Sequence, residues 1–217
     1  MSNLNNIHTD TNIYPPHTLS TNNLLTITQW NSNDCARHTI EAVTNSILST
    51  HLLFLTETWL LSPLRFLTNW QQFHTYAVPV DNTYRGEMGI SLLVHPDCPH
   101  PVIHFPSTSP YVLSCQVSNL LIHCVYLPPA LPDAEAIAAL QQLPTQTHPS
   151  QANTIICGDF NARHSALLGD SRTTQRGAAF YNWMVENGLH CWNSELTFGI
   201  PTYNSHSRIN QRTGIHF

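Results

Sequence analysis

The stretch TIICGDFN, at residues 154–161, decides the fold: an apolar run turns abruptly into glycine, aspartate, phenylalanine and asparagine. Such a run is typical of a buried strand. Residues 24–33 pass in the same way from a strand pattern into Asn-Ser-Asn, and residues 52–59 pass from an apolar run into Thr-Glu-Thr-Trp. Since side chains at strand ends of a layered sheet converge on one edge of the core, we expect these three polar clusters to lie together.

Around these strands, strand patterns alternate with helical periodicity, and neither an internal repeat nor a second domain boundary is visible. Strands outnumber helices, which indicates an α/β (α+β) domain built as a layered β-sandwich flanked by helices. Residues 1–23 are rich in Asn, Thr, Pro and His and read as a disordered leader before a single domain at 24–217. Helices are expected at residues 34–48, 63–70, 132–143 and 176–187, and further strands at 76–80, 90–94, 111–117, 120–127 and 189–192.

The composition limits the possible partners. Only 10% of residues are charged, the formal net charge is −5, and the 8 Lys and Arg residues form no run. A chain that held nucleic acid tightly by itself would show a basic face, whereas a nuclease can bring positive charge in as a bound divalent ion. The six cysteines include no CxxC pair, which favours free thiols in a reducing compartment. No signal peptide or membrane-length apolar run is visible, so we expect an intracellular protein without a membrane partner.

Two carboxylates follow apolar runs directly: Glu57 and Asp159. Burying an isolated carboxylate costs several kcal/mol, roughly, unless a cation or hydrogen-bond donors compensate it. An oxygen-binding cation such as Mg²⁺ or Mn²⁺ meets that demand and suits phosphate chemistry. Taken singly, each residue has a simpler explanation, because Glu57 could be an acid at a helix N-terminus and Asp159 a turn former.

Taken together, the motifs resemble a known family. The order is LTITQWN, LLFLTETWL, GISLLVH, IHCVYLPP, IICGDFNARH, RGAAFYNWMVENGL and PTY, over roughly residues 24–204. This ordered set is similar to the endonuclease/exonuclease/phosphatase superfamily, and within it to the apurinic-type endonuclease domain of non-LTR retrotransposons. The resemblance implies a DNase I-like fold, DNA as a transient substrate, and a reverse transcriptase domain in the full-length protein.

The resemblance also implies roles for individual residues. It makes Glu57 the main metal ligand and Asp159 the carboxylate that orients or deprotonates the attacking water. It makes Asn161 the amide that holds the scissile phosphate, Asn31 an organiser of the metal and catalytic groups, and Tyr126 a phosphate contact. Weaker assignments go to two further residues: Asn33 as a second metal ligand and Thr202 near the substrate. Apart from the resemblance, Arg85, Arg163 and Arg176 lie near these motifs, where a phosphate contact is one interpretation and a solvated arginine is the favoured one.

The chain departs from the family pattern at its end. The family continues with S-x-I-D and then Ser-Asp-His, whereas this sequence reaches Phe217 before either. We therefore expect a domain incomplete at the C-terminus that lacks its last strands, with His164 a poor substitute for the missing His. The expected function is divalent-metal-dependent DNA nicking, in the nucleus if the chain is active. The alternatives are a catalytically inactive remnant of that domain, or a related phosphoesterase that acts on RNA or phospholipid.

Overall fold

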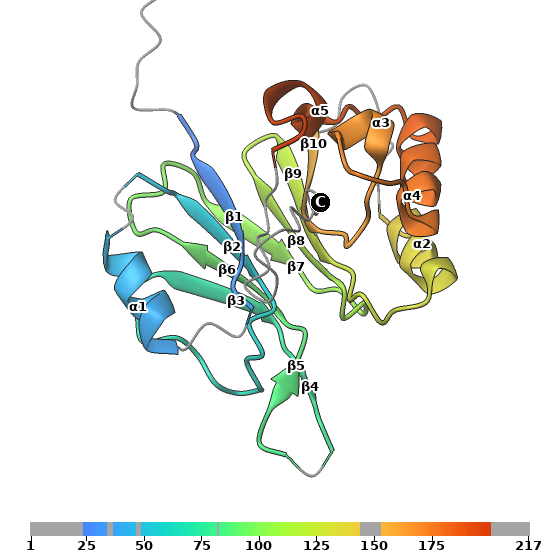
Figure 1. The fold of residues 1–217 in the computed structure, drawn as a ribbon. Helices are drawn as coiled ribbons and strands as arrows, with labels where there is room; N and C mark the ends of the chain where they lie inside the picture. Colours follow the sequence, from blue (N-terminus) through green and yellow to red (C-terminus); the bar gives the residue numbers. More distant parts are fainter. Residues whose placement is uncertain (1–23, 34–36, 47–48, 82, 144–152, 201–217) are drawn as a thin grey trace, which may run out of the picture.

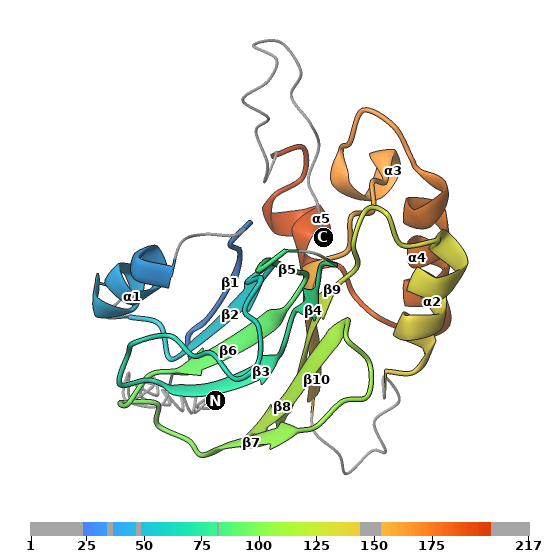
Figure 2. The same cartoon turned by 90° about the horizontal axis from the view of Figure 1, so that it is seen from below.

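The computed structural model describes residues 24–33, 37–46, 49–81, 83–143 and 153–200. Two four-stranded sheets face each other (Figures 1 and 2), which confirms the predicted layered α+β sandwich. The first sheet has the order β1 (Ile27–Asn31), β2 (Leu52–Thr56), β6 (Ile90–Val94), β3 (Gln71–Thr75). The second has the order β10 (Asn153–Asp159), β9 (Leu120–Tyr126), β8 (Val112–Val117), β7 (Val102–Phe105).

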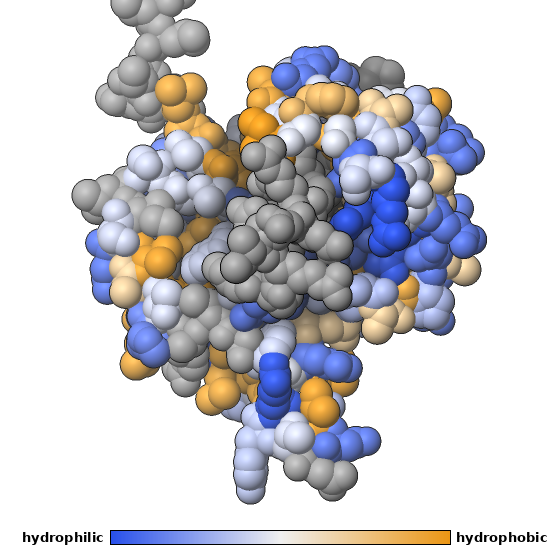
Figure 3. Space-filling view, viewed as in Figure 1, coloured by the Kyte–Doolittle hydropathy of each residue, from blue (hydrophilic) through white to orange (hydrophobic). Residues whose placement is uncertain are grey.

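Helices cover the outer face of each sheet (Figure 2). Helix α1 (Arg37–Ser46) lies against the first sheet, and α2 (Asp133–Gln141), α3 (Ser165–Leu168), α4 (Gln175–Glu186) and α5 (Trp192–Leu196) lie beside the second. A small hairpin of β4 (Val78–Pro79) and β5 (Gly86–Glu87) projects from the first sheet (Figure 1). Hydrophilic side chains gather over the helices beside the second sheet (Figure 3). None of the described helices is long and apolar enough to cross a membrane.

Two parallel strand pairs, one in each sheet, determine where the polar clusters meet. Strand β1 pairs with β2 so that Asn31 lies opposite Thr56, and β10 pairs with β9 so that Asp159 lies opposite Tyr126. Strands β1 and β10 also contact one another across the sandwich. Because parallel strands in register end at the same level, the C-terminal residues of β1, β2, β9 and β10 lie close together at one edge of the sandwich.

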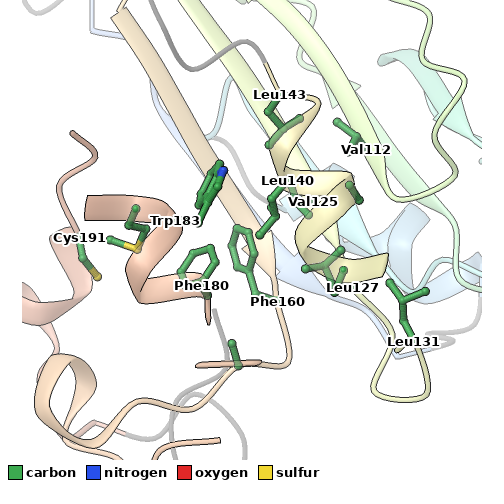
Figure 4. Packing of buried hydrophobic residues seen from close by; sticks show 14 of the residues in the cluster. Val112, Val125, Leu127, Leu131, Leu140, Leu143, Phe160, Phe180, Trp183 and Cys191 are labelled. Atoms are coloured by element: carbon green, nitrogen blue, oxygen red, sulfur yellow. The ribbon is translucent and has the colours of Figure 1, made fainter. Parts of the chain in front are cut away.

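Alternation along the strands divides the core into three layers. In β2, Leu52 and Phe54 pack between the sheets, whereas Leu53 and Leu55 pack outward with Ile40 of α1. This is the period-2 geometry of a strand buried on both faces. The third layer fills the space between the second sheet and the helices α2 and α4 (Figure 4).

The aromatic centre of this third layer lies directly behind the GDFN turn. The ring centroids of Phe160 and Phe180 are 4.7 Å apart, and those of Phe180 and Trp183 are 5.6 Å apart. Figure 4 shows the three rings between β10 and the two helices. Since Phe160 separates Asp159 from Asn161, this packing holds the turn from behind.

Several sequence predictions about single elements are confirmed. The hairpin of residues 111–127 is formed by β8 and β9, and the predicted helices at 132–143 and 176–187 correspond to α2 and α4. The five described cysteines are free thiols; Cys35 lies outside the described residues. The leader at residues 1–23 also lies outside them.

Other local predictions are wrong. Residues 63–70 form turns and bends instead of a helix, because the side chain of Gln72 bonds to both the N–H and the carbonyl of Phe66, at 3.1 and 2.9 Å, and takes the place of helical bonds. The strand expected at 76–80 lies earlier, as β3, and only Val78–Pro79 pair within the expected range.

The strand expected at residues 189–192 is also absent. The Leu189 N–H closes the end of α4 by donating to the Met184 carbonyl at 2.9 Å, and residues 192–196 turn into α5. Trp192 is 64% exposed, whereas Trp70 and Trp183 are buried.

Candidate active site

The turn after β2 carries Glu57 in an unusual backbone conformation. Glu57 has φ of 54°, in the left-handed region that non-glycine residues rarely occupy. The hydroxyl of Ser32, which is buried, donates to the carbonyls of Thr56 and Glu57 at 2.8 and 3.1 Å. The N–H of Thr58 donates to the Gly89 carbonyl at 3.2 Å. These bonds fix the backbone of the turn before and after Glu57.

The turn after β10 depends on Gly158. Its φ is 138°, and a Cβ at this position would lie 1.9 Å from the carbonyl oxygen of Val125 in β9. Only glycine therefore fits. The turn is closed by the backbone N–H of Asn161, which donates to Asp159 Oδ1 at 3.0 Å, while Asn161 itself has φ of 48°.

Asn31 joins the two carboxylates. Its Nδ2 donates to Glu57 Oε1 at 2.8 Å and to Asp159 Oδ2 at 2.6 Å, while its Oδ1 accepts from the backbone N–H of Asn33 at 2.9 Å. Because both carboxylate oxygens bond to the same nitrogen atom, they lie closer together than two hydrogen-bond lengths. The predicted convergence of residues from β1, β2 and β10 is therefore present in the structure.

Tyr126, at the end of β9, lies beside the same pair. It is 5% exposed, and its hydroxyl hydrogen-bonds with the Glu57 carboxylate. Burial raises the pKa of Tyr126 well above its ordinary value, and the negative charges of Glu57 and Asp159 raise it further. The phenol therefore keeps its proton and acts here only as a neutral hydrogen-bonding group.

These residues line a cleft of about 810 Å³ between the sheet ends. Three further residues line the cleft and were not predicted as site residues from the sequence: Gln29, Pro129 and Asn193. Asn193 comes from α5, in the stretch just after the wrongly expected strand. No histidine is among the described residues that line this cleft.

The remaining predicted site residues lie in different places. Asn33 lines the cleft with an exposed side chain, and its backbone N–H bonds to Asn31. The side-chain amide of Asn161 donates to the Leu127 carbonyl at 3.1 Å. Arg163 is partly buried but is not one of the described residues lining the cleft, and Thr202 lies outside the described residues.

The other two arginines near the motifs differ from one another. Arg85 is exposed, and its guanidinium carbon lies 3.4 Å from the centroid of the Trp59 ring, a cation–π contact beside the Glu57 turn. Arg176 is 5% exposed and bonds to backbone carbonyls, so neither solvation nor phosphate contact describes it.

The donor set fits a hard divalent cation. Glu57 and Asp159 supply adjacent carboxylate oxygens, and Asn31 and Asn33 supply amide groups at the same place, which are ligands that Mg²⁺ and Mn²⁺ accept. Glu57 forms no ion pair with any Lys, Arg or His among the described residues. A cluster of three or more His, Cys, Asp or Glu ligands is not found in the described part of the chain. A cation here would therefore keep several water ligands, as Mg²⁺ commonly does.

Comparison with known proteins agrees with this arrangement. The family model described as endonuclease-reverse transcriptase matches residues 120–213. The structure is similar to the "endonuclease domain of TRAS1, a telomere-specific non-LTR retrotransposon", with a TM-score of 0.61 and 18% identity over 82% of this chain and 78% of that one. No curated protein matches the sequence.

Two further structures share the fold. An AP endonuclease from Archaeoglobus fulgidus matches with a TM-score of 0.54 and 13% identity over 75% of this chain and 70% of that one. The 3'-5' exonuclease NExo from Neisseria meningitidis matches with a TM-score of 0.52 and 18% identity over 74% and 70%. The family match over residues 120–213 and the shared fold agree with the resemblance of the sequence motifs to the endonuclease/exonuclease/phosphatase superfamily.

Proposed function

We propose that this chain is a divalent-metal-dependent phosphodiesterase that nicks DNA, the endonuclease domain of a retrotransposon-type protein that also carries a reverse transcriptase. The observation that carries the proposal is the placement of Glu57 and Asp159 on one amide group within an open cleft. The similarity to the TRAS1 endonuclease domain and the description of the matching family support DNA as the substrate and a reverse transcriptase as the neighbouring domain.

In the proposed chemistry, water attacks a phosphodiester and forms a new P–O bond, the P–O bond on the opposite side breaks, and the leaving oxygen takes a proton from solvent. Asp159 orients that water and accepts its proton, and Asn31 keeps the Asp159 carboxylate in position through the 2.6 Å bond. The amide of Asn161 donates to a non-bridging phosphate oxygen. The neutral phenol of Tyr126 gives its single proton to Glu57 in this structure and exchanges that bond for one to a phosphate oxygen when substrate binds. Fixed donors of this kind stabilise charge that develops in the transition state.

Glu57, with the amide oxygens of Asn31 and Asn33 nearby, would hold Mg²⁺ or Mn²⁺. A bound divalent cation supplies charge neutralisation at the phosphate, which a chain of net charge −5 cannot supply from its own surface.

One observation favours a second candidate, a domain of this fold without turnover. No histidine is among the described cleft residues, whereas the resemblance implies an essential His in this family. In the second candidate the fold and the carboxylate pair are kept, but no histidine among the described cleft residues completes the proton transfer.

Nicking of supercoiled plasmid by this chain with Mg²⁺ or Mn²⁺ tests the proposal. We expect nicking that chelation abolishes and that Glu57→Gln lowers by about 100-fold or more, the scale on which single electrostatic groups act in catalysis. The matched control is Glu186→Gln, because Glu186 is exposed on α4 and remote from the cleft residues. It should nick like the wild type.

Parallel assays with RNA and with phospholipid vesicles decide the substrate class. Faster metal-dependent hydrolysis of either would replace DNA in the proposal. A folded chain that binds Mn²⁺ but hydrolyses neither DNA, RNA nor phospholipid would establish the second candidate, a domain of this fold without turnover. Nicking that is equal in Glu57→Gln and wild type would reject the assignment of the site.

A further inference from the structure

Arg176 is the described arginine whose charge lies inside the protein. It belongs to the first turn of α4, is 5% exposed, and pairs with Asp133 of α2 through a 3.0 Å bond from Nε to Oδ1. A buried charge of this kind is costly unless all its donors are used. Its remaining donors point to backbone carbonyls of two separate loops.

The first of these loops follows β9. The Arg176 Nη1 donates to the carbonyls of Pro128 and Leu127 at 3.0 and 3.4 Å, and Nη2 donates to the carbonyl of Leu131. These residues come directly after Tyr126, so the guanidinium fixes the loop that continues from the buried phenol.

The second loop is the GDFN turn. The Arg176 Nη1 also reaches the carbonyl of Phe160 at 3.5 Å, between Asp159 and Asn161. The two loops meet at Leu127: its N–H donates to the Asp159 carbonyl at 2.9 Å, and its carbonyl accepts from both Arg176 and the Asn161 side chain. One guanidinium thus binds the backbone of both loops that carry Tyr126, Asp159 and Asn161.

We propose that Arg176 is a positioning residue, which sets the spacing between the Tyr126 loop and the Asp159–Asn161 turn and so the geometry of the proposed reaction. This inference rests on the proposed function only for its kinetic consequence. Arginine suits the task because its planar group presents five donors in a fixed fork, whereas lysine presents one point charge. The neighbouring Gly177 supports the requirement for close approach, since a Cβ there would lie 1.9 Å from the Arg163 carbonyl oxygen.

The test compares Arg176→Met and Arg176→Lys with two controls. Arg172→Met removes an exposed arginine from the loop before the same helix, and Met184→Ala removes a buried side chain of the same helix that cannot donate a hydrogen bond to the carbonyls of either loop. The first readout is amide hydrogen exchange in the absence of substrate. Exchange at Leu127 and Asn161 should accelerate in Arg176→Met, less in Arg176→Lys, and not in either control.

The second readout is steady-state kinetics at a temperature where every variant is folded. We expect kcat to fall by about 10- to 100-fold in Arg176→Met with little change in KM, because small displacements of reacting groups have effects of this size. Met184→Ala should lower the melting temperature but leave kcat unchanged. Arg176→Lys should recover part of kcat. If Arg176→Met does not fold, Arg176→Lys carries both comparisons.

The outcomes separate the two claims. Unchanged exchange at Leu127 and Asn161 would overturn the positioning role, as would a loss of kcat in Met184→Ala equal to that in Arg176→Met. An inactive wild type with accelerated exchange at these two amides in the Arg176 variants would reject the proposed function and retain the structural role.

Discussion

Replacing Asn31 by alanine tests whether the amide holds the two carboxylates together. The substitution removes two bonds to charged acceptors, at 2.8 and 2.6 Å, and the Asp159 acceptor is only 8% exposed. A hydrogen bond to a charged group contributes about 1.5–3 kcal/mol, and the lower end applies because the pair is partly exposed. We therefore expect the free energy of unfolding to fall by about 3 kcal/mol without divalent ions.

An independent estimate gives a similar size. Two unit charges about 5 Å apart, at an effective dielectric constant of about 20, repel by about 3 kcal/mol. The two amide bonds thus offset the repulsion between the Glu57 and Asp159 carboxylates. Without the amide, this repulsion is no longer offset and lowers the free energy of unfolding.

Equilibrium unfolding in urea, followed by tryptophan fluorescence, measures the effect as a change in midpoint at constant m-value. The matched control is Gln29→Ala, on the same strand and lining the same cleft, where one bond of 3.4 Å to Thr56 Oγ1 is lost. Its loss should be less than about 1 kcal/mol. Equal destabilisation by the two substitutions would refute the reasoning, because burial on β1 would then explain both.

Three further predictions concern stability. Burial lowers the pKa of His74 from 6.5 to about 4, with smaller contributions from neighbouring positive groups. Because folding lowers this pKa, neutral His74 contributes its full stability above pH 6.5, and that contribution is lost as the pH falls towards 4. The free energy of unfolding should therefore fall by about 2–3 kcal/mol over this range. His74→Gln should flatten this dependence when unfolding is measured across pH. Gly158→Ala should prevent soluble expression or lower the melting temperature by more than about 10 °C. Gly188 also has a positive φ, of 63°, but nothing lies within 4 Å of the added Cβ, so Gly188→Ala should lower the free energy of unfolding by only about 1 kcal/mol. Trp183→Ala should cost about 3–5 kcal/mol, and Trp192→Ala, at an exposed position, less than about 0.5 kcal/mol in the same denaturation assay; similar losses would show that the aromatic layer does not stabilise the fold as described.

The sequence predicted two strands from their apolar runs. Residues 52–55 form an apolar run that is fully buried, as expected, and the polar group after them lies at the strand end. Residues 154–157 do form a strand, but the expectation that it is buried is wrong, because β10 is an edge strand of the described sheet and Ile155 is 36% exposed. The convergence of Glu57 and Asp159 followed from their positions after these strands. Their common bond to Asn31 did not, because it depends on the register between strands of two different sheets.

The elements that the sequence did not predict are defined by pairing. Strand β3 has the sequence QQFHT, with no hydrophobic alternation, and it is a strand because residues 71–75 bond to β6. Strand β7 lies among prolines at the edge of the second sheet. Arg176 was interpreted as a surface residue because helical periodicity carries no information about the carbonyls that converge on its guanidinium.

The candidate site also contains strained backbone conformations. Asn33, Glu57 and Asn161 all have positive φ, and each such residue costs about 1–3 kcal/mol when it is not glycine. The same place holds two carboxylates side by side. A sequence under selection for stability alone would relieve both costs with glycines at the turns and one neutral side chain in place of an acid. The strained residues and the two like charges at this edge of the sandwich are therefore better explained by a ligand that binds there. A cation next to a phosphate would neutralise the negative charge of Glu57 and Asp159.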